Sequence, residues 1–385
     1  MRYVFTIWVA ILGWLVAGCG ATANPKQSSR TAASRPARDQ QLLDASWVSA
    51  NEGWVLSGEP CAALGSCARL AHTTNGGRSW QALTGPRAAV TPGAFMCSRH
   101  PCVSDVLFAD PQVGYLYGPS LLMTRDGGVS WRAVRGTYTE TLALADGRAW
   151  RVAFDHTGCP GPCNAVLQEA RIGARAWHTL KRLGSVLGTQ IVSSGSSLLV
   201  AIYGNQAGGT SAQAVLYRST DGGGSWRVQT DPCSGRAPDG SHAEQDLTDL
   251  ATARGGFFAG LCSPHTGFGT FVVTSTDGGR SWITAGAVPA RAQVSLLAAA
   301  SPTTLAAASG PVGGRGSFTA RLLISSDGGH RWRPAAANRQ QITLLLGAPA
   351  WLGFQTPREG RWIASPKDLW VTTDGGSRWR RAAAP

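Results

Sequence analysis

An eight-residue pattern, S/T-x-D-G-G-x-x-W, recurs along this 385-residue chain and restricts its possible folds more than any other feature. Clear copies occupy residues 73–80, 124–131, 219–226, 275–282, 325–332 and 372–379. Two adjacent glycines supply the positive φ angles of a tight hairpin, while the Asp carboxylate accepts hydrogen bonds from turn N–H groups. The Trp can pack its indole on neighbouring strands. Each copy therefore predicts a structural hairpin, called here a repeat turn.

The spacing of the copies predicts a seventh one. Successive Asp positions, with Asn75 standing in the first copy, are 51, 95, 56, 50 and 47 residues apart, so the second interval is about twice the others. A degenerate copy at residues 170–177 keeps Gly173 and Trp177 and divides that interval into two of ordinary length. The structural positions assigned to the repeat turns are Asn75, Trp80, Asp126, Trp131, Trp177, Asp221, Trp226, Asp277, Trp282, Asp327, Trp332, Asp374 and Trp379.

A strand, a turn and an aromatic strand precede each repeat turn, as in residues 47–56 and 106–118. Each period of about 50 residues thus holds four strands, a to d, with the repeat turn joining c to d. Four-stranded repeats of this length are typical of propeller blades. We predict an all-β fold, a single seven-bladed β-propeller of four-stranded antiparallel blades over residues 43–385. The expected blades are approximately 43–84, 103–136, 139–182, 187–230, 246–287, 292–336 and 340–385.

The amino terminus predicts export. Arg2 precedes an apolar run, residues 3–17, that is short for a membrane span, and the run ends in Leu-Val-Ala-Gly-Cys. This ending resembles a bacterial lipobox, which implies a signal peptide over 1–18 and a diacylglycerol on Cys19. Residues 19–42 then form a flexible tether, and the protein is extracytoplasmic and anchored to the bacterial cell membrane. The alternatives are a plain secretory signal or a membrane anchor.

The net charge and the cysteine count indicate which partners and which cross-links the protein can have. The formal net charge is +13, and 32 of the 35 basic residues are Arg, which reflects either a composition bias or a basic surface for an anionic partner. Export disfavours nucleic acid. The eight other cysteines are even in number and lack zinc-ribbon spacing, which favours local disulfides over a metal site. The predicted pairs are Cys61 with Cys67, Cys97 with Cys102, Cys159 with Cys163, and Cys233 with Cys262.

The repeat turns resemble those of the bacterial-neuraminidase (BNR) or Asp-box repeat superfamily. Seven blades and a lipobox are, within it, similar to the photosystem II assembly and stability factors and their bacterial relatives. The resemblance covers residues 43–385. It implies that the a–b and c–d turns share one face and that ligands bind on the other, where the long b–c and d–a loops gather.

All eight paired cysteines fall in those long loops, so disulfides are expected to brace the binding face. In blade 7 the expected b–c loop is residues 355–368. The candidate binding residues on this face are Arg99, His100, Asp155, His156, Arg236, His242, Glu244, His265, Arg315, Arg358 and Arg361.

We predict a non-catalytic binding or assembly scaffold for a membrane protein or an envelope component. The protein is expected to be monomeric and to need no cofactor or metal. The alternative is a glycan-binding or glycoside-hydrolysing propeller, for which two loop carboxylates at glycosidase separation would be needed. A sialidase is disfavoured because the chain has only six tyrosines and no Arg-Ile-Pro motif before the first repeat turn. The loop acids that keep hydrolysis open are Asp155, Asp231, Asp239, Glu244, Asp246 and Glu359.

Overall fold

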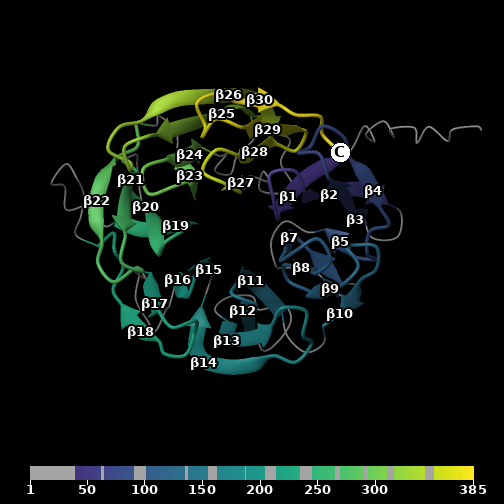
Figure 1. Cartoon of the computed structure of the whole chain (residues 1–385), viewed down its shortest axis with the longest axis horizontal. Helices are drawn as coiled ribbons and strands as arrows, with labels where there is room; N and C mark the ends of the chain where they lie inside the picture. Colours follow the sequence, from purple (N-terminus) through teal and green to yellow (C-terminus); the bar gives the residue numbers. More distant parts are fainter. Residues whose placement is uncertain are drawn as a thin grey trace, which may run out of the picture. The chain divides into compact units, whose positions relative to one another are not determined.

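The computed structural model describes the chain from residue 40 onward. The described residues are 40–61, 65–90, 101–134, 138–154, 163–186, 188–203, 214–234, 245–264, 269–289, 294–309, 316–342 and 351–385. They form an all-β ring of seven antiparallel blades, and the first strand of each blade, strand a, is the innermost (Figure 1). This confirms the predicted fold. No helix of the described part is long and apolar enough to cross a membrane.

Each blade takes four consecutive strands. Blade 1 has β1 (Gln41–Trp47), β2 (Gly53–Cys61), β3 (Gly65–Thr73) and β4 (Gln81–Leu83), with β5 (Ala89–Val90) and β6 (Cys102–Val103) added beside β3. Blade 2 has β7 (Asp105–Phe108), β8 (Gly114–Tyr117), β9 (Leu122–Thr124) and β10 (Arg132–Ala133). Blade 3 has β11 (Tyr138–Ala145), β12 (Arg148–Phe154), β13 (Cys163–Arg171) and β14 (His178–Val186). Blade 4 has β15 (Gly188–Ser194), β16 (Ser197–Tyr203), β17 (Val215–Ser219) and β18 (Arg227–Gln229).

The remaining three blades follow the same order. Blade 5 has β19 (Gln245–Ala253), β20 (Phe257–Pro264), β21 (Phe271–Ser275) and β22 (Ile283–Ala287). Blade 6 has β23 (Val294–Ala299), β24 (Leu305–Ser309), β25 (Gly316–Ser325) and β26 (Arg333–Ile342). Blade 7 has β27 (Trp351–Phe354), β28 (Gly360–Ser365), β29 (Asp368–Thr372) and β30 (Arg380–Arg381).

The core lies between the blades, because each blade packs both of its sheet faces against neighbours. Strand b is therefore apolar along its length: β16 and β24 have buried side chains at nearly every position. One buried cluster joins Leu261 and Val272 of blade 5 to Leu297 and Leu305 of blade 6. Burial on both faces explains the near-continuous apolar runs, which would otherwise alternate with polar residues.

The repeat turns are closed by their own side chains. In blade 2, Thr124 Oγ1 donates to the Asp126 carboxylate at 2.7 Å and accepts the Gly128 N–H at 2.9 Å. Asp126 Oδ1 also accepts the Ser130 N–H at 2.8 Å. Gly127 and Gly128 have φ values of 72° and 95°, a region that side-chain-bearing residues rarely adopt. The acid, the hydroxyl and both glycines of the motif thus have structural functions.

In six blades the first glycine of the repeat turn ties the c–d turn to the a–b turn of the same blade, and in blade 3 the residue before that glycine does so. Gly127 N–H donates to Gln112 O in blade 2, and Gly278 N–H donates to Gly256 O in blade 5. In the degenerate copy of blade 3, Ile172 N–H makes the corresponding bond to Gly147 O. We call the face with these turns the turn face, and the opposite face, with the b–c and d–a connections, the loop face.

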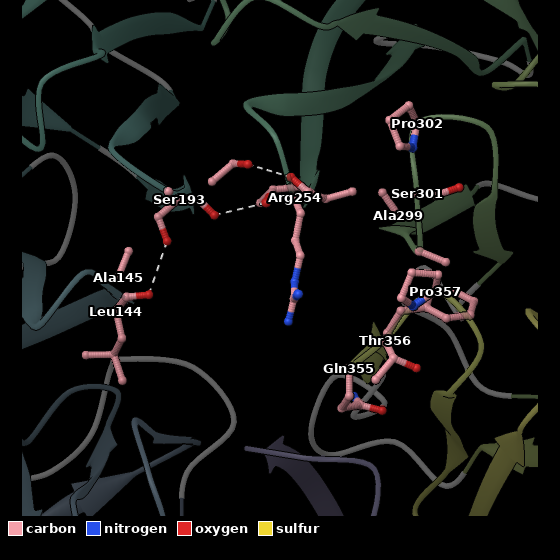
Figure 2. Close-up of a pocket in the computed structure, with 16 residues that line it drawn as sticks. Leu144, Ala145, Ser193, Arg254, Ala299, Ser301, Pro302, Gln355, Thr356 and Pro357 are labelled. Carbon is pink, nitrogen blue, oxygen red and sulfur yellow. Dashed lines mark hydrogen bonds between the residues drawn. The ribbon is translucent and has the colours of Figure 1, made fainter.

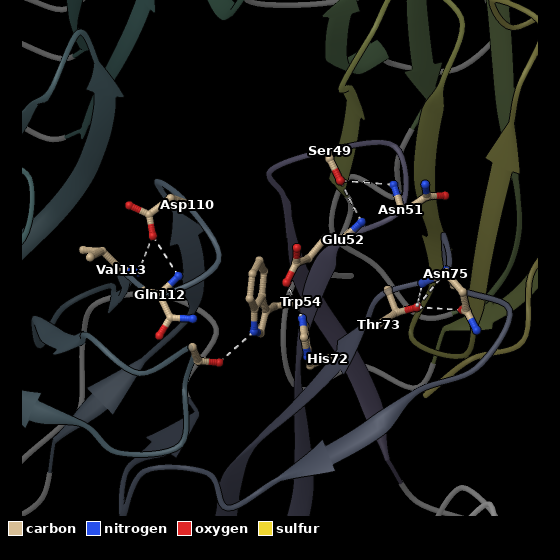
Figure 3. A network of polar contacts seen from close by, with 12 residues as sticks. Ser49, Asn51, Glu52, Trp54, His72, Thr73, Asn75, Asp110, Gln112 and Val113 are labelled. Atoms are coloured by element: carbon tan, nitrogen blue, oxygen red, sulfur yellow. Dashed lines mark hydrogen bonds and ion pairs between the residues drawn. The ribbon is translucent and has the colours of Figure 1, made fainter.

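The junction between blades 1 and 2 shows how neighbouring blades are held (Figure 3). Trp54, fully buried on β2, lies between His72 at 4.6 Å and Phe108 of blade 2 at 3.7 Å between ring centroids. Its Nε1–H donates to Gly127 O at 3.0 Å, in the repeat turn of blade 2. The tryptophan therefore fixes both the spacing of the two blades and the position of the next turn.

The ring closes without a shared strand. The carboxyl-terminal strand β30 pairs with β29 of its own blade, and β1 begins at Gln41, two residues before the propeller was expected to start. Side chains and single hydrogen bonds join blades 7 and 1: Leu42 N–H donates to Pro366 O at 2.7 Å, and Trp80 Nε1–H donates to Ala383 O at 2.9 Å. Apolar packing around Leu42 and Ile363 completes the seam.

Disulfides lie on the loop face. Cys61 is bonded to Cys67 and Cys233 to Cys262, as the spacing suggested, and Cys102 is also disulfide-bonded. Cys61 and Cys262 lie at the loop-face ends of the b strands, and Cys102 and Cys233 lie in d–a connections. The predicted partner Cys97, and the Cys159–Cys163 pair as a whole, lie outside the residues whose side chains are described.

Candidate functional site

Most of the predicted binding residues cannot be placed. Those outside the described residues are Arg99, His100, Asp155, His156, Arg236, His242, Glu244, His265 and Arg315, and the lipidation residue Cys19 lies outside them too. The loop-face site therefore stays a prediction. Two members of the set, Arg358 and Arg361, are described.

The prediction for Arg358 and Arg361 was wrong. Residues 355–359 form the a–b turn of blade 7, not a b–c loop, and the Arg358 carbonyl accepts the Gly375 N–H of the repeat turn. Arg358 is thus on the turn face. Arg361 lies on β28 and is 4% exposed, so it is part of the packed junction with blade 1. The b–c loop of blade 7 was expected at residues 355–368, but strand a is only Trp351–Phe354 and strand b begins after the turn, at Gly360.

A cavity of about 370 Å³ opens on the turn face, at the end of the central channel. Its walls are the inner strands and a–b turns of blades 3 to 7, so five separate parts of the chain contribute to it (Figure 2). The lining residues are Leu144, Ala145, Ser193, Ser194, Gly195, Thr252, Ala253, Arg254, Ala299, Ala300, Ser301, Pro302, Phe354, Gln355, Thr356 and Pro357. Arg254 is the one charged residue among them.

Arg254 is held at the base of a short, anchored turn. It is followed by Gly255 and Gly256, both at positive φ, before β20 begins. Gly256 N–H donates to Ser194 Oγ of blade 4 at 2.9 Å, and Gly256 O accepts the Gly278 N–H of its own blade. The exposed side chain extends into the cavity (Figure 2). No hydrogen bond or ion pair of its guanidinium occurs within the described part of the chain.

Sequence reasoning did not select Arg254. No motif marks it, because the cavity exists only when inner strands from five blades meet. One signal was present: Arg254 is the only charged residue in the segment 250–260. An a–b turn that carries an arginine and two glycines could have been singled out on that ground.

Carboxylates along the inner strands join adjacent blades. Asp44 Oδ2 accepts Val106 N–H of blade 2 at 2.7 Å, and Asp249 Oδ2 accepts Leu297 N–H of blade 6 at 2.7 Å. Glu140 accepts Thr189 Oγ1–H of blade 4 at 2.8 Å. Burial raises the pKa of Asp249 to about 6 and of Glu140 to about 7, and it raises the pKa of Asp44 well above its ordinary value, with the nearby Asp105 adding to the effect. These acids stabilise the ring, and none lines the cavity.

Three of the loop acids that would be needed for hydrolysis, Asp231, Asp246 and Glu359, lie in the described part of the chain, and burial together with the charge of Asp246 raises the pKa of Asp231. Asp231 is buried and accepts the N–H groups of Cys233 at 2.7 Å and Leu247 at 3.1 Å. Glu359 lies on the turn face, where it accepts Thr356 Oγ1–H at 3.1 Å. Asp155, Asp239 and Glu244 fall outside the described residues. Among the described residues, no group of three or more His, Cys, Asp or Glu could hold a metal ion.

Exposed arginines surround the outer margin of the turn face. Every blade has at least one between the first glycine of its repeat turn and the first residue of strand d, and this segment contains no Asp or Glu in any blade. In the described part of the chain, none of them makes an ion pair. These residues, which we call the arginine belt, are Arg78, Arg132, Arg175, Arg227, Arg280, Arg331, Arg333, Arg378 and Arg380.

Comparisons with known proteins support the fold class and do not assign a family. No protein-family model and no curated protein sequence matches the chain. Among solved structures, the chain is similar to the β-propeller domain of the Trilobed protease from Pyrococcus furiosus, with a TM-score of 0.54, 7% identity and coverage of 90% of this chain and 97% of that one. It is also similar to an ancestral GH74 enzyme, with a TM-score of 0.55, 13% identity and coverage of 90% and 46%.

A third similar structure is YCF48 bound to a D1 peptide. The TM-score is 0.46 at 17% identity, over 76% of this chain and 82% of that one. At these identities the likenesses concern the fold alone. The protein is therefore defined as a seven-bladed β-propeller with an arginine-rich outer margin and a polar cavity at one end of its channel.

Proposed function

We propose that the protein is a non-catalytic scaffold that is anchored by lipid on Cys19, outside the cytoplasm, and binds a membrane protein or an anionic envelope component. The arginine belt is the observation that carries this proposal. Nine exposed guanidinium groups, with at least one in each blade, present positive charge around the ring. Such a distribution attracts an extended or multivalent anionic partner.

Protection of sheet edges explains only part of the belt. Strand d is the outer edge of each blade, and charged side chains on an edge prevent pairing with another chain. All the charged residues of the seven d strands are basic, because these strands contain no Asp or Glu. The exclusive use of basic residues supports selection for an anionic partner as well.

The disulfides support a location outside the cytoplasm. Cys61–Cys67 and Cys233–Cys262 are formed, and disulfides persist in oxidising compartments. A lipid at Cys19 would keep the propeller near the membrane surface through the predicted tether, residues 19–42. A membrane-bound partner would then be within reach of the belt.

The cavity supports binding over catalysis. The lining residues that the structure describes include no carboxylate, imidazole or thiol that would serve as a general acid or base. The proposal can be tested by chemical crosslinking of the intact lipoprotein in membranes, followed by purification, in parallel with a panel of glycan substrates. We expect a membrane partner with the native chain, its loss with Cys19→Ala, and no glycan turnover. Turnover of a glycan, or an equal yield with Cys19→Ala, would contradict the proposal.

A further inference from the structure

We infer that the turn-face cavity is a binding site for a compact ligand that carries a carboxylate, with Arg254 as the group that recognises the charge. This adds a small-ligand site to the proposed scaffold and does not involve the arginine belt. The site is on the turn face, whereas the sequence predicted ligand binding on the opposite, loop face.

The electrostatics of the cavity select an anion. Among the described residues of the lining, Arg254 contributes the only formal charge, and no acid opposes it. A guanidinium offers a planar set of N–H donors that matches the two oxygens of a carboxylate, and such charge-assisted pairs are stronger than neutral hydrogen bonds. Because the Arg254 turn is hydrogen-bonded to Ser194 and Gly278, its backbone loses little conformational entropy when a ligand binds.

The other polar groups leave few free donors. Each of the five hydroxyl groups on the lining already takes part in a hydrogen bond within the protein: Thr252 donates to Ser193 O, and Ser193 donates to Leu144 O. The hydroxyls of Ser194, Ser301 and Thr356 are likewise engaged. Among the described side chains of the lining, the uncommitted donors are therefore the Arg254 guanidinium and Gln355 Nε2. A ligand that binds these donors must therefore carry hydrogen-bond acceptors, such as carboxylate oxygens.

The size and the remaining walls define the body of the ligand. A volume of about 370 Å³ is near the lower end of ordinary small-molecule sites. Apolar side chains, including Leu144, Pro302, Phe354 and Pro357, make up much of the wall. The site thus fits a carboxylate joined to a small apolar body, either as a free acid or as the end of a peptide.

The test is calorimetric titration of the full-length lipoprotein in nanodiscs, with empty nanodiscs as the blank. The probes are 3-phenylpropionate with its uncharged analogue 3-phenylpropanol, and N-acetyl-phenylalanine with its amide. We expect each acid to bind, and each uncharged analogue to bind at least about tenfold more weakly. Tighter binding of 3-phenylpropionate would indicate a free acid as the ligand, and tighter binding of N-acetyl-phenylalanine would indicate the carboxyl end of a peptide.

The variant Arg254→Gln should weaken binding of the acids about 10- to 100-fold without changing the melting temperature, because the side chain is exposed. The control is Arg321→Gln, an exposed arginine of β25 that lies outside both the cavity and the arginine belt, which should bind like the native chain. Equal affinity for acid and uncharged analogue, native affinity in Arg254→Gln, or no binding of either acid would overturn the inference. Capture of the membrane partner is expected to be unchanged in Arg254→Gln, so the two proposals fail separately.

Discussion

The guanidinium of Arg361 lies 3.5 Å from the centroid of the Trp47 ring, across the seam where blade 7 meets blade 1. The same guanidinium donates to the Ala50 carbonyl of blade 1 and to the Gln355 side chain of its own blade. Burial lowers the pKa of Arg361 to about 10, so the group stays charged at neutral pH. A single cation thus joins the two ends of a ring that has no shared strand.

Replacing this cation should weaken ring closure. In Arg361→Lys the ammonium cannot stack as a plane or reach both carbonyl acceptors at once. We expect the free energy of unfolding to fall by roughly 2–4 kcal/mol, measured by urea denaturation. The control is Arg358→Lys, three residues earlier and exposed, which should change stability by less than about 0.5 kcal/mol. Equal stability of the two variants would show that Arg361 does not hold the seam.

The Trp54 hydrogen bond can be separated from the packing of its ring. Trp54→Phe removes the donor to Gly127 O and leaves that carbonyl without its partner. Trp150 is also fully buried on a b strand, and within the described part of the chain its Nε1 has no hydrogen-bond partner. Trp150→Phe is therefore a matched control for the loss of ring volume. We expect Trp54→Phe to be less stable than this control by about 1–3 kcal/mol in denaturant titrations; equal losses would assign the effect to volume alone.

Stability should fall as the pH rises from 4.5 to 7. Burial raises the pKa of Glu140 from 4.5 to about 7, so over this interval the native state holds a proton that the unfolded chain has released. The stabilisation from this proton is complete at pH values below the pKa of Glu140 in the unfolded chain, and it is lost as the pH rises through the pKa of Glu140 in the folded protein. Glu140→Gln keeps an acceptor for Thr189 and should gain roughly 2–3 kcal/mol relative to the native chain between pH 5 and pH 8. Parallel stability curves would contradict this account of Glu140.

The two disulfides should differ in their contribution to stability. Cys233–Cys262 closes a segment with a sequence separation of 29, against 6 for Cys61–Cys67. In the chain-entropy account, the longer loop restricts the unfolded chain more, by about 1 kcal/mol. The double variant Cys233→Ala with Cys262→Ala should therefore melt below the double variant Cys61→Ala with Cys67→Ala in calorimetry. The reverse order would count against an entropic explanation.

Much of the fold was predictable because each blade repeats the same local chemistry. Gly173 and Trp177 sufficed to locate a repeat turn that lacks its acid, and Gly173 has the expected positive φ of 78°. Blade 7 was harder. Its a–b turn, with Pro357 and Arg358, looks like a long polar loop, and both flanking segments are apolar, so nothing local distinguishes the a–b turn from a b–c loop.

The cavity could not be predicted for a different reason. Arg254 lies near Ser193, Ser301 and Thr356 only because inner strands from separate blades converge at the channel end. That arrangement depends on ring closure, which is a property of all seven blades together. The arginine belt was within reach of sequence analysis, since all its members lie between the repeat glycines and the start of strand d. Their exposure follows from the position of strand d at the outer edge.

The central claim, that the arginine belt binds an anionic partner, is tested most directly by the yield of crosslinked partner from membranes. The variant combines Arg132→Gln, Arg227→Gln, Arg333→Gln and Arg380→Gln, four exposed positions that each begin a d strand. The control carries Lys at the same four positions and so keeps the charge. We predict that the Gln variant recovers at least about tenfold less partner, that the Lys control recovers most of it, and that added salt lowers the native yield. Equal yields from the Gln variant and the native chain would contradict the account.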